Sequence, residues 1–316
     1  MVSLNNVFLD VDTGVDDALA LLLAARSPEL NVKGVTCVAG NVPLEDVVRN
    51  TLDVLSIADV SDIPVAIGME SPIVEEMFNA TEIHGTNGLG GIDVKHSIIK
   101  PIEKHAVEFL AEEIDNSVDK ATIVALGPLT NIATMFNMYP HVKTKIEQLV
   151  IMGGTIGSGN ITPTSEFNIR QDPEAADIVF SADIPILLYT WDVFVRVVFN
   201  RSEIEEMTSS SNICKRFAGQ LLSSYLVSKG EDFAGIGDAG AVVCLLVPNA
   251  ITTNTLPISV ELQGEYTRGQ TVVDQRKNRL SRLQPHIQKS ITNSAKVVMD
   301  LDVEVFRSTF VDNISK

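Results

Sequence analysis

The chain has 316 residues, and its 41 Asp and Glu outnumber its 24 Lys and Arg, which gives a formal net charge of −17. This charge argues against nucleic acid or an anionic membrane surface as a partner, because both are bound through clustered basic side chains. The three cysteines, Cys37, Cys214 and Cys244, are too few and too widely spaced for a disulfide framework or a zinc ribbon. Each lies in an apolar run, so we expect all three to be buried.

Short β-branched runs alternate with longer helical patterns along the first part of the chain. Buried strands are predicted at 7–9, 32–38, 65–67, 121–126, 149–152 and 184–188. Helices are predicted at 17–26, 43–58, 102–114, 129–138 and 173–180. This alternation is typical of right-handed βαβ units and of a parallel sheet that is covered on both faces.

The pattern changes in the last third of the chain. Residues 200–250 are predicted to be mostly helical, and late strands follow at 255–261, 271–274 and 296–301, before a last helix. We find no internal repeat and no Pro- or Ser-rich linker. The sequence therefore predicts one α/β domain over residues 1–316, with an open, mostly parallel twisted sheet flanked by helices and a mostly helical C-terminal portion.

The N-terminal residues lack a basic segment followed by an apolar stretch, the pattern of a secretory signal. No uninterrupted apolar run approaches the ~18 residues needed to span a bilayer. We therefore expect a cytoplasmic protein without a membrane segment.

Four aspartates follow the first predicted strand within eight residues: Asp10, Asp12, Asp16 and Asp17. Ligands of open parallel sheets bind just beyond the carboxyl ends of the strands, where these residues lie. Asp16 and Asp17 could serve only as charges at a helix N-terminus, but this does not explain Asp10 and Asp12. Two unit charges about 4 Å apart repel by roughly 4 kcal/mol at an effective dielectric of 20. The turn therefore predicts a bound cation, and oxygen ligands without His or Cys favour Ca²⁺ or Mg²⁺.

Another class of enzyme also begins with a strand followed by Asp-x-Asp. These are the phosphatases of the haloacid dehalogenase type, which depend on Mg²⁺. Their next two residues are usually Gly-Thr, whereas this chain has Thr13-Gly14, and Asp16 and Asp17 would have no task. We keep this phosphatase as the less favoured alternative.

Polar and glycine-rich residues follow the other predicted strands as well. They are Ala39-Gly40-Asn41, Leu126-Gly127-Pro128-Leu129-Thr130-Asn131, Met152-Gly153-Gly154, Asn160 with Glu166-Phe167-Asn168, and Asp238. With the acidic turn, this ordered set resembles the inosine–uridine-preferring nucleoside hydrolases over residues 7 to 310. The resemblance implies a Rossmann-related nucleoside hydrolase-like fold and Ca²⁺-dependent hydrolysis of ribonucleosides to ribose and free base, as used in purine or pyrimidine salvage. It also implies a homodimer or homotetramer that acts on a small-molecule nucleoside.

The resemblance also implies roles for single residues around the metal. One Ca²⁺ would be held by Asp12, Asp17, the backbone carbonyl of Leu126 and Asp238, and it would orient a bound water and ease its deprotonation. Asp12 would take the proton of that water as general base, and Asp10 would lie behind it and hold the site in place.

The remaining implied roles concern the sugar. Its hydroxyls would be bound by Asp16, Asn41, Asn160, Glu166 and Asn168, with Met152 and Phe167 in apolar contact near its 5′ end. Departure of the base would leave an oxocarbenium-like sugar in the transition state, and the carboxylates around it would stabilise this positive charge.

The chain departs from the family pattern at one position. Many relatives carry a histidine immediately before the metal-binding aspartate of the C-terminal helix, where it can protonate the leaving base, and this chain has Gly237 there. A positioned general acid typically contributes 10²–10⁴-fold. His84, in a glycine-rich segment that resembles the mobile flap of the family, is the best substitute, and Tyr225 and Phe233 are expected to lie over the base. A second hypothesis is therefore a nucleoside- or ribose-binding relative with little or no hydrolase activity.

Overall fold

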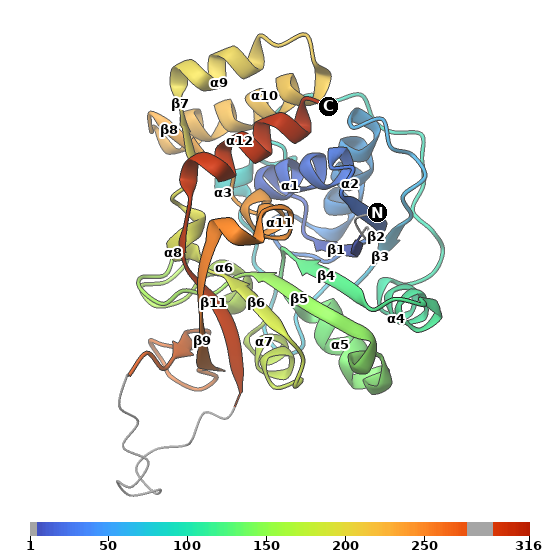
Figure 1. The fold of residues 1–316 in the computed structure, drawn as a ribbon, viewed down its shortest axis with the longest axis vertical. Helices are drawn as coiled ribbons and strands as arrows, with labels where there is room; N and C mark the ends of the chain where they lie inside the picture. Colours follow the sequence, from blue (N-terminus) through green and yellow to red (C-terminus); the bar gives the residue numbers. More distant parts are fainter. Residues whose placement is uncertain (1–4, 277–292) are drawn as a thin grey trace, which may run out of the picture.

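The computed structural model describes residues 5–276 and 293–316. Within these residues, nine strands form one sheet in the order β10-β9-β11-β6-β5-β4-β1-β2-β3, and β7 pairs with β8 apart from it (Figure 1). The sheet strands are β1 (Asn5–Val11), β2 (Leu30–Cys37), β3 (Val65–Ile67), β4 (Ala121–Ala125), β5 (Ile146–Met152), β6 (Ile186–Tyr189), β9 (Ile251–Val260), β10 (Thr271–Val273) and β11 (Ser294–Leu301). The separate pair consists of β7 (Val198–Asn200) and β8 (Phe233–Gly235).

Most of the sheet is parallel, as the alternation of strands and helices predicts. β1 pairs in parallel with β2 and β4, so that Leu9 lies opposite Val35 on one side and Val124 on the other. The exceptions lie at one edge, where β9 runs antiparallel to both β11 and β10. Because the parallel strands run in one direction, the carboxyl ends of β1, β2, β4, β5 and β6 lie along the same edge of the sheet.

Helices cover both faces of the sheet (Figure 1). The α-helices of the described residues are α1 (Val15–Arg26), α2 (Leu44–Ile57), α3 (Thr81–His84), α4 (Ala106–Asn116), α5 (Thr130–Met138), α6 (Phe167–Gln171), α7 (Pro173–Phe180), α8 (Trp191–Phe194), α9 (Arg201–Thr208), α10 (Ile213–Lys229), α11 (Ala239–Leu246) and α12 (Val303–Ile314). Two 3₁₀ turns span Pro140–Lys145 and Pro248–Ala250. Helices α1, α2, α11 and α12 contribute to the apolar core on one face, and α4, α5 and α7 contribute to the core on the other.

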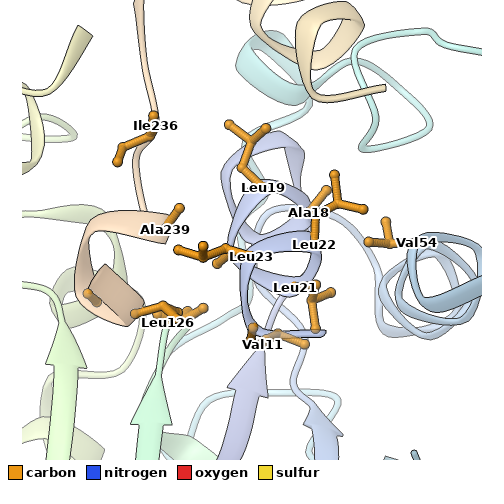
Figure 2. Close-up of a cluster of buried hydrophobic side chains, with 14 of the residues drawn as sticks. Val11, Ala18, Leu19, Leu21, Leu22, Leu23, Val54, Leu126, Ile236 and Ala239 are labelled. Carbon is orange, nitrogen blue, oxygen red and sulfur yellow. The ribbon is translucent and has the colours of Figure 1, made fainter. Parts of the chain in front are cut away.

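Helix α1 lies at the centre of the larger core. Its leucines from 19 to 23 are fully buried, and Figure 2 shows side chains on several sides of the helix packing toward Val54 of α2, Ala239 of α11 and Val11 of β1. A helix that is apolar on all sides is a buried helix, and α1 is therefore held firmly between its neighbours. Its N-terminus follows the acidic turn directly, so the rigid packing of α1 fixes the position of that turn.

The structure corrects the sequence prediction in detail. Helix α4 starts at Ala106 instead of 102, since His105 caps it through Nδ1, which accepts a hydrogen bond from the Val107 N–H at 3.3 Å. Strand β8 lies inside the region predicted to be mostly helical, β7 ends at the first residue of that region, and β9 starts four residues earlier than predicted. The three cysteines are buried, as predicted. None of the described helices is long and apolar enough to cross a membrane.

Candidate functional site

Asp10 lies inside β1, beneath the acidic turn, and is completely buried. Its Oδ1 accepts hydrogen bonds from Thr36 Oγ1 at 2.5 Å and from Asn131 Nδ2 at 2.8 Å. Burial raises the pKa of Asp10 to about 7, against the lowering effect of these two donors. Asp10 thus anchors the turn to β2 and α5 and does not line the cavity described below.

Asp12 and Asp17 hold the turn together from within. The backbone N–H of Asp12 donates to Asp17 Oδ1 at 3.2 Å, and Asp12 Oδ2 accepts from the Asn41 N–H at 2.7 Å. Asp17 Oδ2 accepts from the Gly14 N–H at 3.0 Å and from Asn41 Nδ2 at 3.1 Å. Burial raises the pKa of Asp12 well above its ordinary value and that of Asp17 to about 7, and neighbouring carboxylates raise both further.

Three carboxylates converge at the carboxyl edge of the sheet. Ligand atoms of Asp16, Asp17 and Asp238 all lie within 4.8 Å of one another, and Asp238 comes from the start of α11, more than 200 residues along the chain. Burial raises the pKa of Asp238 well above its ordinary value, with the charge of Asp16 as the second cause. Asp16, to which the family resemblance assigns a sugar contact, is thus also a member of the cluster.

The environment of these carboxylates fits a hard divalent cation. Among the described residues, Asp12 Oδ1 is a buried oxygen without a hydrogen-bond partner. A buried carboxylate oxygen without a donor is costly, and a cation removes this cost by supplying positive charge directly. The clustered ligand atoms are all carboxylate oxygens, which suit Ca²⁺ or Mg²⁺ better than zinc.

The residues predicted for the far side of the sugar form a second group, centred on the start of α6. Glu166 is buried and accepts from the Asn168 N–H at 2.9 Å and from the Gly154 N–H at 2.8 Å, while burial raises its pKa to about 7. Asn168 Nδ2 donates to the Leu126 carbonyl at 2.6 Å and to the Met152 carbonyl at 3.2 Å. Asn168 therefore connects this group to the carbonyl predicted to bind metal.

His84 lies at the end of α3 and is 5% exposed. Its Nδ1 accepts the Val15 N–H at 3.1 Å, which leaves the proton of the neutral ring on Nε2. The same nitrogen is 3.5 Å from Tyr225 Oη and 3.7 Å from Asp16 Oδ1. His84 and Tyr225, predicted to act on the base side, therefore lie together beside the carboxylate cluster.

A cavity of about 620 Å³ opens over both groups. This volume is in the range of small-molecule sites. The predicted site residues that line it are Asp16, Asn41, His84, Leu126, Met152, Asn160, Glu166, Phe167, Asn168, Tyr225, Phe233 and Asp238. Of the predicted metal ligands, Asp12 and Asp17 lie behind this lining and are fully buried.

The sequence profile of the inosine-uridine preferring nucleoside hydrolases matches residues 7–308 of this chain. The chain belongs to this family. It is therefore a hydrolase of the N-glycosyl class, and the family match decides against the phosphatase alternative.

Named relatives of this nucleoside hydrolase agree. It is 40% identical to the pyrimidine-specific ribonucleoside hydrolase RihA of Escherichia coli O9:H4 (strain HS) over 273 residues, which cover 85% of this chain and 88% of the relative. It superposes on a plant nucleoside hydrolase, the PpNRh1 enzyme, with a TM-score of 0.92 and 29% identity, over 99% of both chains. A purine-preferring ribonucleoside hydrolase from Gardnerella vaginalis gives a TM-score of 0.88 and 30% identity, over 98% of both chains.

Sequence reasoning missed an aromatic pair on the wall of the nucleoside hydrolase cavity. Trp191 and Phe194 of α8 line it, with ring centroids 4.8 Å apart and ring planes at 31°. Trp191 follows the end of β6 by two residues, so the rule that sites lie beyond strand ends could have found it.

Phe194 also explains the glycine at position 237. Gly237 has φ = +55°, and a Cβ there would lie 2.6 Å from Asp16 Cβ and 3.0 Å from the Phe194 ring. A histidine side chain at position 237 therefore has no room without displacement of Phe194 or Asp16. In this nucleoside hydrolase the side chain that many relatives carry at this place is excluded by packing.

We expect Gly237→Ala to lower the free energy of unfolding by about 2–4 kcal/mol and kcat by at least about tenfold, because the new Cβ pushes Asp16 and Phe194 apart. Gly230→Ala is the matched control, since Gly230 also has positive φ, +63°, but has open space around its Cβ direction. The control should cost about 1 kcal/mol and leave kcat unchanged. Urea unfolding and steady-state kinetics measure both effects, and equal losses in the two variants would contradict the packing explanation.

We expect the cation-free protein to lose stability as pH rises. Burial raises the pKa of Glu166 from 4.5 to about 7, so its protonated form favours the folded state. This contribution is fully present below about pH 4.5 and is lost as pH rises through 7, which amounts to up to about 3 kcal/mol. The pKa values of Asp10 and Asp17 are also raised to about 7, so these groups likewise lower the stability of the folded state as pH rises. Urea unfolding of dialysed protein at pH 5 and pH 8 measures the difference, which Glu166→Gln should reduce; a flat profile would refute the prediction.

Proposed function

We propose that the protein hydrolyses the N-glycosidic bond of ribonucleosides in a Ca²⁺-dependent reaction, with pyrimidine ribonucleosides as its preferred substrates. The observation that carries this proposal is the cluster of Asp16, Asp17 and Asp238, the last two buried, beside a cavity of about 620 Å³ whose other walls hold the predicted sugar ligands. Negative charge at this place favours both a cation and a sugar that becomes positive in the transition state.

The cation would be held by Asp12, Asp17, the carbonyl of Leu126 and Asp238, with Asp16 within reach of the same cluster. When bound, it orients water and eases its deprotonation, and it provides positions for sugar hydroxyls. Ca²⁺ is favoured over Mg²⁺ because carboxylates, a carbonyl and diol oxygens together suit its larger and more flexible coordination.

The protein's own groups would then complete the reaction. Asp12, whose Oδ1 is without a donor among the described residues, takes a proton from the water that attacks C1′. Asp16 and Asn41 bind ribose hydroxyls, and the far side of the sugar contacts Asn160, Glu166 and Asn168. Contacts that tighten as the sugar becomes positive lower the barrier most.

The leaving base needs a proton as the bond from C1′ to nitrogen breaks, and we assign this role to His84. Its Nδ1 is occupied by the Val15 N–H, so Nε2 carries the proton that the ring can donate. Tyr225, buried against His84, and Phe233, 55% exposed at the cavity, would hold the base by ring contacts.

Release of reducing sugar from a panel of purified ribonucleosides tests the proposal. The pyrimidine preference is proposed because the relative that is 40% identical is named a pyrimidine-specific ribonucleoside hydrolase. Cleavage of cytidine or uridine faster than inosine or guanosine would support this preference. Tight ribose binding in calorimetry without cleavage of any nucleoside would favour the binding-protein alternative instead.

We also propose that the chain works as one domain in a cytoplasmic homodimer or homotetramer. The two apolar cores lie on opposite faces of a single sheet, which supports one domain, and the oligomer follows from the family resemblance. Light scattering coupled to size-exclusion chromatography measures the oligomeric state, and a monomer would contradict this part.

A further inference from the structure

Arg268 lies outside the cavity lining, in the connection between β9 and β10, and is about one-fifth exposed. Its guanidinium binds both carboxylate oxygens of Glu174, at 2.8 and 2.9 Å, and it also donates to Glu75 and to the Leu262 carbonyl. Both bonds to Glu174 come from Nη2, and hydrogen bonds between ionised groups are roughly twice as strong as neutral ones. One side chain thus connects three segments that are distant in sequence.

The first of these segments is the connection between β9 and β10, in which Arg268 itself lies. It holds the sugar-side loop, which we define as residues 153–166; this loop carries Asn160 and ends at Glu166. Ser165 Oγ donates to the Arg268 carbonyl at 2.9 Å, and Thr164 Oγ1 donates to the Tyr266 carbonyl at 3.1 Å. At the other end of the loop, the Thr155 N–H donates to Thr271 Oγ1 at 2.9 Å. Residues 266–271 therefore hold the sugar-side loop at both ends.

The second segment is the strap, residues 69–80, which leads into α3 and His84. Glu75 in the strap binds Arg268 and lies 3.2 Å from Arg170 of α6. Farther along the strap, the Phe78 and Phe167 rings pack edge to face, with their centroids 5.5 Å apart. The Ala80 N–H donates to the Asn41 carbonyl at 2.9 Å. The strap thus reaches two walls of the cavity.

The third segment is the first turn of α7, which carries Glu174. Helix α7 belongs to the apolar core on its face of the sheet, so Glu174 is a fixed point of attachment. The Arg268 side chain holds the connection between β9 and β10 to this fixed point and to the strap. The backbone carbonyls of the same connection hold the sugar-side loop, so loss of the side chain should shift Glu166 and the α3 wall together.

We propose that Arg268 is a positioning residue that sets the sugar-side loop and the strap at the correct separation for ribose. The proposal rests on the proposed function, because it names the ribose arm of that site. It assigns Arg268 no contact with the substrate. Displacement of binding groups by about 1 Å can cost on the order of 10²-fold in rate, so a remote residue of this kind can have a large effect.

The test compares Arg268→Gln, Arg268→Lys and the control Arg49→Gln, which removes a partly exposed pair with Asp46 within α2. For Arg268→Gln we expect kcat/KM to fall by about 10²-fold and ribose affinity by at least about tenfold, while Ca²⁺ affinity stays within about twofold. The separation is expected because β1 and α11 hold the carboxylate cluster independently of Arg268. For Arg268→Lys we expect kcat/KM and ribose affinity between those of the unmodified protein and Arg268→Gln, since lysine keeps the positive charge but lacks the planar guanidinium donors.

Hydrogen exchange supplies a measure that does not depend on activity. Amides of residues 154–168 should exchange at least about tenfold faster in Arg268→Gln, and those of β1, β4 and α1 should not change. Unchanged exchange in 154–168, or equal losses of ribose and Ca²⁺ affinity, would overturn the proposal. If the unmodified protein cleaves no ribonucleoside, the proposed function fails, and the exchange data alone decide the role of Arg268.

Discussion

Replacement of Asp12 by asparagine is expected to lower kcat for ribonucleoside hydrolysis by about 10³-fold or more. Asparagine keeps the shape of the side chain but cannot accept a proton from water, and it offers the cation a neutral oxygen in place of a charged one. The loss should appear in kcat rather than in the free energy of unfolding. Burial already raises the pKa of Asp12, so replacement of its carboxylate by a neutral amide does not cost folding stability.

Steady-state kinetics on the fastest ribonucleoside of the panel measures this effect, with urea unfolding beside it. Asp62→Asn is the control, since Asp62 is exposed and far along the chain from the turn. A variant that is at least as stable as the unmodified protein but keeps more than a tenth of its kcat would contradict the role of Asp12 as general base.

Removal of divalent cations is expected to abolish hydrolysis, with a loss of about 10³-fold or more that Ca²⁺ reverses. Three buried carboxylates, Asp12, Asp17 and Asp238, have pKa values raised by burial and by neighbouring negative charge, and cannot all stay ionised near neutral pH without a counter-charge. In the proposed function, the sugar site and the general base Asp12 both depend on the arrangement that a bound cation would maintain.

Dialysis against a chelator, followed by titration with Ca²⁺ or Mg²⁺ in separate samples, measures the loss and its recovery. Calorimetry of Asp238→Asn should show loss of Ca²⁺ binding, whereas Asp62→Asn should bind normally. Full activity in protein that contains no divalent metal by elemental analysis would refute the dependence.

Local sequence signals predict most of the elements. Helix α7 matches its predicted bounds because Asp172 caps it, accepting the Ala175 N–H at 3.0 Å, and a proline occupies its first position. Strands β7 and β8 have three residues each and pair with one another from distant positions, so neither carries enough positions to display a period. The first half of β9, rich in Thr and Asn, is a strand because β11 pairs with it.

The candidate site also combines residues that local sequence signals predict with contacts that depend on distant parts of the chain. The position of Asp10, Asp12 and Asn41 follows from the rule that sites lie at strand ends. The approach of Asp238 to Asp16 depends on the packing of α11 against α1, which no local pattern encodes. The sequence likewise marks Gly237 as unusual, but only the structure reveals that Phe194 fills the space beside it.

The place of β11 in the sheet bears on how the chain reaches its folded state. β11 is the last strand in sequence, yet it lies between β6 and β9, so β9 and β10 join the sheet only through it. During synthesis, β6 remains an open edge until residues 294–301 have been made, and an open edge is a template for pairing with other chains. A stop codon shortly before residue 294 should therefore lead to aggregation of the product rather than to a smaller enzyme with partial activity.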